Sequence, residues 1–138
     1  MITFATAQAL KDAGLPWAPA EHDFFVFPDH NLDDRVFVLA EMPASLAQLQ
    51  GETVFTFQGA MEWALDYIVT TAAVWLPSET QLRQALEARL PGPRLSLNVG
   101  PEGCRLEVQT AAGPLAFTGA SAEAAYAAAL LHLLRRPP

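Results

Sequence analysis

The chain contains one complete start signal for a helix, in the stretch Trp75-Leu76-Pro77-Ser78-Glu79-Thr80-Gln81-Leu82. Ser78 is a favourable N-cap residue, and Gln81 stands three positions later, where the partner of a capping box belongs. Apolar residues then recur at helical spacing as far as Pro91-Gly92-Pro93, a run that cannot continue a helix. The sequence therefore predicts a helix near 79–90.

Strict alternation of apolar and polar residues follows this helix, over 94–99 and again over 104–109. Such alternation predicts half-buried antiparallel strands. A turn leads from them to a third strand at 115–117, and Ser121 then caps a last helix, predicted over 122–135. The order of this unit is α-β-β-β-α. Because one face of its sheet is polar, both helices are expected to pack on the other face, unless the polar face meets the N-terminal half.

The start of the chain predicts a short helix from Thr3 to Ala13. Phe4, Ala7 and Leu10 are expected on one face, and Gly14 supplies a left-handed residue that ends the helix. The prolines that follow favour an extended segment.

Two strand-like runs come next, 24–27 and 35–40, joined by a polar turn from Pro28 to Asp34. They predict a hairpin. Because both runs are apolar at consecutive positions, each strand is expected to be covered on both faces. Residues 43–51 are interpreted as a connection with helical character, and residues 53–57 as a third strand.

The pattern over 60–71 fits either a strand or a helix, and its alanine, methionine, glutamate and leucine residues favour the helix. The resulting fold class is α+β, with antiparallel meanders and packed helices. The 138 residues fit one compact domain. The alternative is a subdivision into an apolar, acidic half, 1–74, and the α-β-β-β-α half, 75–138.

The composition, 51% hydrophobic and 17% charged, is that of a chain that folds. No apolar run is long enough to span a bilayer and no basic signal-peptide start is present, so a cytoplasmic protein is expected. Cys104 is the single cysteine, which excludes an intrachain disulfide and a thiolate metal cluster.

The formal net charge is −7, and it is unevenly distributed. Residues 1–66 carry ten acids and two bases, net −8. This balance argues against nucleic acid and anionic membrane as partners, because those interactions depend on clustered positive charge. It favours a basic protein partner, whose approach the acidic half would steer. The alternative is an acidic surface that keeps the protein soluble and binds no partner.

Three motifs resemble a group of small uncharacterised bacterial and phage-borne proteins. The first is the start Ala7-Gln8-Ala9-Leu10-Lys11-Asp12-Ala13-Gly14-Leu15-Pro16, and the second is the central Pro77-Ser78-Glu79-Thr80-Gln81-Leu82. The third is the beginning of the last helix at Ser121. The resemblance covers the ends and the centre of the chain but not 21–73. It implies a fold built on similar caps and turns, and no activity.

The densest set of metal-ligand residue types lies in or beside the first hairpin turn: His22, Asp23, Asp29, His30, Asp33 and Asp34. Two imidazoles and several carboxylates suit zinc or manganese, and an open coordination position could activate water. The spacing matches no defined metal motif. A solvated turn explains the same residues, because Asp side chains satisfy nearby backbone amides, and this interpretation is preferred.

Other candidate chemistry is weaker. Cys104 lies on the apolar side of its strand, where a thiol is inert, and His132 is better explained as a residue on a helix flank than as a catalytic base. Aromatic residues near the hairpin could form an exposed binding patch, although the core is their more usual place: Trp17, Phe25, Phe27 and Phe37.

The favoured function is therefore that of a noncatalytic accessory or protein-interaction protein without a cofactor, which binds a protein partner or a second copy of itself. The expected partner-binding residues are Trp17, Phe25, Phe27, Phe37, Asp29, Asp33 and Asp34. The alternative is a small metal-dependent hydrolase that uses the His22/Asp23/Asp29/His30 loop. A pocket that brings His22 and His30 together would favour the enzyme.

Overall fold

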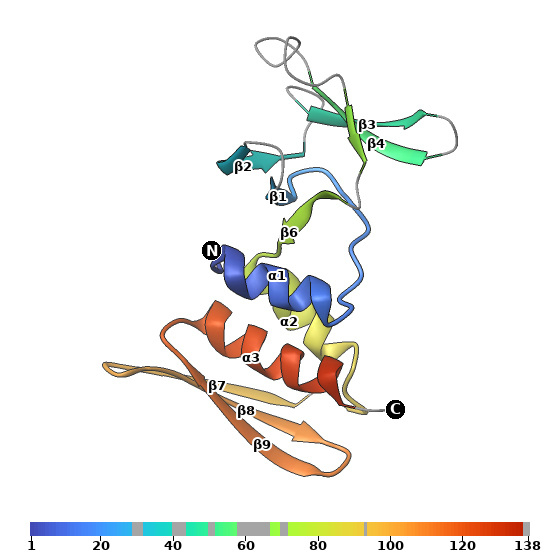
Figure 1. The fold of residues 1–138 in the computed structure, drawn as a ribbon. Helices are drawn as coiled ribbons and strands as arrows, with labels where there is room; N and C mark the ends of the chain where they lie inside the picture. Colours follow the sequence, from blue (N-terminus) through green and yellow to red (C-terminus); the bar gives the residue numbers. More distant parts are fainter. Residues whose placement is uncertain are drawn as a thin grey trace. The chain divides into compact units, whose positions relative to one another are not determined.

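The computed structural model describes residues 1–28, 32–39, 44–49, 52–57, 67–69, 72–92 and 94–136. The chain is an α+β protein, as predicted, and it divides into two compact units (Figure 1). One unit consists of Met1–Pro16 together with Pro77–Pro138, and the other of Trp17–Leu76. The first sixteen residues therefore belong with the C-terminal part of the chain. None of the described helices has the length and apolar character needed to cross a membrane.

The helix that follows Ser78 is α2 (Glu79–Glu87). Ser78 Oγ accepts from the amide of Gln81 at 3.2 Å, and the Ser78 amide donates to Gln81 Oε1 at 2.9 Å, so the predicted capping box is present. The helix ends before residue 90, where it was predicted to end. The amides of Arg89 and Leu90 donate to the carbonyls of Leu86 and Glu87, three residues earlier instead of four, because Pro91 disfavours helical backbone at the residue before it.

The predicted meander is confirmed as β7 (Leu95–Gly100), β8 (Gly103–Thr110) and β9 (Gly113–Gly119), paired antiparallel in that order. Leu97 pairs with Leu106, and Leu106 pairs with Phe117, so these three residues share one face of the sheet. The side chains of the other face are polar or small and exposed.

Helix α3 (Ala122–Arg135) is the middle layer of this unit. It packs against β8 and β9, and both α1 and α2 pack against α3 (Figure 1). The expectation that both helices of the α-β-β-β-α unit would pack on the sheet is confirmed for α3, whereas α2 packs against α3. Helix α3 is apolar nearly all round, as a helix covered on two sides must be, and Ala125, Ala129 and Leu130 are fully buried. Gly119 permits the close approach of β9 to α3, since a Cβ there would lie 2.7 Å from the amide nitrogen of Ala125.

The predicted first helix is confirmed as α1 (Phe4–Asp12), with Thr3 as its N-cap and Gly14 at a φ of +97°. Ala7 and Leu10 are buried, but Phe4 is 45% exposed and does not share their face as expected. In a helix with 3.6 residues per turn, Phe4 lies about 120° around the axis from Leu10.

The unit Trp17–Leu76 contains two three-stranded antiparallel sheets. In the first sheet, β1 (Phe24–Phe27) lies between β2 (Leu32–Val38) and β6 (Val74–Leu76). The predicted hairpin is present, but its second strand begins at Leu32, within the stretch assigned to the turn. Strand β6 was not predicted, because three residues next to a strong helix start carry little signal of their own.

In the second sheet, β4 (Glu52–Phe57) lies between β3 (Ala44–Leu49) and β5 (Tyr67–Val69). The helical character expected over 43–51 was wrong at β3, and the helix favoured over 60–71 was wrong at β5. Residues 60–66, 70 and 71 lie outside the described part of the chain. Pairing with β4 overrides the helix propensity of alanine, leucine and glutamine here, because ladder hydrogen bonds come from residues distant in sequence.

Candidate functional site

The β1–β2 hairpin presents two different apolar faces. Phe25 pairs with Phe37, and Phe24 pairs with Val38 on one side and with Leu76 on the other. Directly opposed residues of an antiparallel pair share a face, and successive residues alternate between faces. Phe25 and Phe37 therefore lie on one face, and Phe24 lies on the other together with Val38, whereas Val36 lies where the register of the two strands shifts.

The first face is an aromatic core. Phe25 and Phe27 are fully buried, and their ring centroids lie 5.3 Å apart in an edge-to-face arrangement. Phe37 stacks on Phe25 at 5.7 Å, and Trp17 stacks on Trp75 at 6.1 Å with an 8° angle between the ring planes. Trp17 and Phe37 are partly buried. Four aromatic residues were expected to bind a partner. Two of them, Phe25 and Phe27, are thus inaccessible, and the other two, Trp17 and Phe37, pack against this core.

Asp23 supports the aromatic core. It is only 4% exposed, and its Oδ2 accepts from Trp17 Nε1 at 2.9 Å and from the amide of Ala20 at 3.0 Å. A buried carboxylate needs such donors, and these two fix the indole of Trp17 in its stack. The carboxylate of Asp23 therefore has a structural role, as the acceptor of these two hydrogen bonds.

His22 closes the base of the same hairpin through its backbone. Its amide donates to the carbonyl of Leu39 at 2.6 Å, and its φ of +74° lies in the left-handed region, which is uncommon for a residue other than glycine. Its side chain is exposed. Asp29 and His30 lie outside the described residues, so the loop proposed as a metal site stays a prediction. Among the residues that are described, no three His, Cys, Asp or Glu side chains lie together as metal ligands would.

The second face of the hairpin carries apolar side chains in contact with solvent. Phe24 is 40% exposed and Val36 is 50% exposed, whereas Val26 and Leu76 are buried. Phe24 pairs with Val38, which lies two residues from Val36 along β2, and the register between β1 and β2 shifts between Phe25 and Phe27. We refer to Phe24 and Val36 as the hairpin patch.

Phe25 and Phe27 occupy the core, which the sequence analysis gave as the more usual place of these aromatic residues. In Phe24-Phe25-Val26-Phe27 every residue is apolar, so hydrophobicity alone cannot tell which parity faces the core. Trp17 was the residue that could have indicated the core side, because its large ring packs on the face that carries Phe25. The remaining expected partner-binding residues are acidic. Asp33 and Asp34 lie in β2, where the structure describes their backbone and not their side chains.

The two other reactive residues lie in the unit that contains the meander. Cys104 is 8% exposed and belongs to the inner face of β8. His132 is exposed on α3, with its ring centroid 5.5 Å from that of Phe117. The structure thus places His132 at a helix surface, in contact with an aromatic ring.

Charge is segregated between the two units. The unit Trp17–Leu76 carries nine acids and one base, net −8, whereas the other unit carries six acids and seven bases, net +1. The hairpin patch belongs to the acidic unit. No protein-family model, curated protein or solved structure matches this chain.

Proposed function

We propose that this protein is a noncatalytic accessory protein that binds another protein through the hairpin patch. The exposure of Phe24 and Val36 carries the proposal, because both are apolar residues of the β1–β2 hairpin, whose Phe25 and Phe27 side chains are buried in a core. Exposed apolar side chains gathered on one hairpin are typical of an interaction site. An aromatic anchor such as Phe24 typically supplies much of the binding energy at an interface.

The charge of the unit favours a basic protein over a second copy of the chain. Two copies that met through the hairpin patch would bring together two units of net −8, and like charges oppose such an encounter. A partner with basic residues around an apolar pocket would be attracted instead. In this proposal the hairpin patch provides affinity and the carboxylates of the unit increase the association rate.

Comparative affinity capture tests the proposal. Wild-type protein, Phe24→Ser, Val36→Ser and Val99→Ser are used as baits in native lysate, and captured proteins are quantified by mass spectrometry. Val99 is the matched control, because it is 74% exposed and lies in the other unit. We expect a basic protein that is captured by the wild type and by Val99→Ser but lost with both hairpin variants.

Two results would contradict the proposal. One is a set of captured proteins that is the same for all four baits. The other is a wild-type protein that sediments as a dimer which Phe24→Ser converts to a monomer, since the hairpin patch would then be the contact between copies. Circular dichroism of each variant verifies that the fold is retained.

A further inference from the structure

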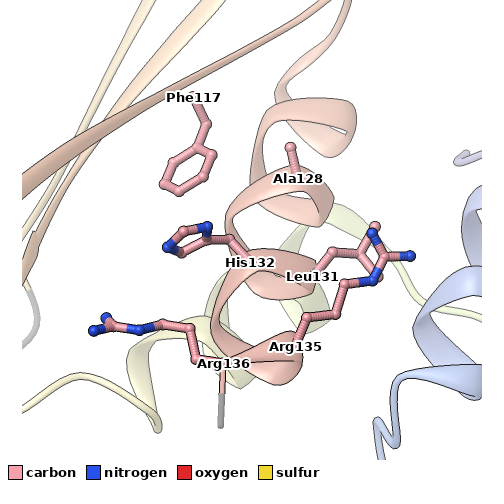
Figure 2. A pocket seen from close by; sticks show the side chains of 6 residues that line it. All are labelled: Phe117, Ala128, Leu131, His132, Arg135 and Arg136. Atoms are coloured by element: carbon pink, nitrogen blue, oxygen red, sulfur yellow. The ribbon is translucent and has the colours of Figure 1, made fainter.

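A hollow of about 560 Å³ lies between the C-terminal half of α3 and strand β9 (Figure 2). This volume lies within the range of pockets that hold small molecules in proteins. The hollow lies entirely within the unit that contains the meander, and it is separate from the hairpin patch. Six residues line it: Phe117, Ala128, Leu131, His132, Arg135 and Arg136.

One part of the lining is apolar and flat. Phe117 projects from β9 toward α3, and the His132 ring faces it at a centroid distance of 5.5 Å, with an angle of 59° between the planes. Ala128 and Leu131 also line the hollow. A planar apolar group could therefore lie in the hollow against the Phe117 ring.

The other part of the lining is basic. It contains one imidazole and two guanidinium groups and no acidic residue. Figure 2 shows that His132 and Arg136 extend from α3 on the side of Phe117, whereas the guanidinium of Arg135 lies on the side of Leu131. His132 lies in the last turn of α3, and Arg136 is the C-cap residue that follows the helix.

Arg135 and Arg136 differ from Arg83 and Arg89 of the same unit in their side-chain hydrogen bonds. Arg83 pairs with Glu87 at 2.9 Å, and Arg89 donates to the carbonyl of Ala85 at 3.2 Å. Arg135 and Arg136 make no side-chain hydrogen bond or ion pair with any residue that the structure describes. A favourable interaction with the helix dipole explains a positive charge in the last turn. It does not use the guanidinium donors, whose planar arrangement matches a carboxylate or a phosphate.

We propose that this hollow binds a small organic anion in which a carboxylate or phosphate group is joined to a flat apolar group. Arg136 and the N–H of His132 donate to the oxyanion, and the flat group lies on Phe117. Arg135 adds positive charge to the site without direct contact.

Ligand titration of the full chain, followed by amide NMR shifts at neutral pH, tests this site. The probes are phenyl phosphate, benzoate, inorganic phosphate and benzyl alcohol. We expect saturable binding of phenyl phosphate or benzoate with shifts centred on Phe117 and residues 131–136, and the tighter of the two identifies the charged group. Inorganic phosphate lacks the ring and benzyl alcohol lacks the charge, so both should bind at least about tenfold more weakly.

Variants assign the roles. Arg136→Gln should weaken binding by about tenfold, because a hydrogen bond to a charged group is lost, and Arg135→Gln should weaken it less. Arg94→Gln is the matched control, since Arg94 is exposed, belongs to the same unit and does not line the hollow. Phe117→Leu keeps an apolar side chain but should remove the preference for a ring. The proposal is overturned if neither oxyanion probe binds saturably, if inorganic phosphate binds as tightly as phenyl phosphate, or if Arg94→Gln weakens binding as much as Arg136→Gln.

Discussion

Replacement of Leu130 by alanine should strongly destabilise the unit built around α3. Leu130 is 0% exposed, on a helix that packs against the sheet on one side and against α1 and α2 on the other. Full burial of a leucine side chain is worth about 1.5–3 kcal/mol. Truncation also leaves a cavity, so the expected loss in unfolding free energy is about 2–5 kcal/mol.

The adjacent leucine provides the control. Leu131 is partly exposed and lines the hollow beside α3, so Leu131→Ala should cost about 1 kcal/mol, less than a fully buried site. Both substitutions change helix propensity equally, and the difference between them therefore reports burial. Guanidinium denaturation followed by circular dichroism at 222 nm is the appropriate assay, because every described helix belongs to this unit. Equal losses for the two variants, or a larger loss for Leu131→Ala, would refute the placement of α3 as a middle layer.

Three further predictions concern single residues of the same unit. Ser78→Ala should lower the unfolding free energy by about 0.5–2 kcal/mol in denaturant melts, because it removes the N-cap acceptor of α2. Gly103→Ala should lower it by about 1–3 kcal/mol, since φ is +120° and the new Cβ would lie 2.6 Å from the carbonyl oxygen of Gly119, whereas Gly92→Ala should be nearly neutral. Burial, and to a smaller extent the carboxylates of Glu79 and Glu87, raises the pKa of Tyr126 above its ordinary value, and Arg83 partly offsets this. The stability that Tyr126 contributes is thus present below about pH 10 and is lost as the pH rises through the folded-state pKa. Above that pH, the unfolding free energy of Tyr126→Phe should therefore fall less steeply with pH than that of the wild type.

The unit around α3 could be predicted largely from sequence because its signals are local. Ser78 and Ser121 mark helix starts through bonds to residues three positions away, and the alternation over 94–109 depends only on neighbouring residues. What could not be predicted was the order of its layers, since contact of α2 with α3 is decided by tertiary packing.

The acidic unit could be predicted only in part because its structure depends on pairing between distant residues. Ala44–Leu49 has no strong strand character of its own and becomes a strand through its ladder with β4. Strand β6 is three residues long and pairs with β1, about fifty residues earlier in the chain. The hairpin patch was missed for a related reason. Phe25 faces the core and Phe24 faces solvent because Trp17 and Trp75 pack on the Phe25 side of the strand.

The kinetics of binding between this protein and a captured partner test the proposed interaction most directly. Association and dissociation rates are measured for wild-type protein, Phe24→Ser and Val99→Ser at low and at physiological salt. We predict that Phe24→Ser increases the dissociation rate, that Val99→Ser leaves it unchanged, and that salt lowers the association rate of all three, because the charge of the acidic unit is screened. Dissociation rates that are equal for wild type and Phe24→Ser, together with association rates indifferent to salt, would contradict the account.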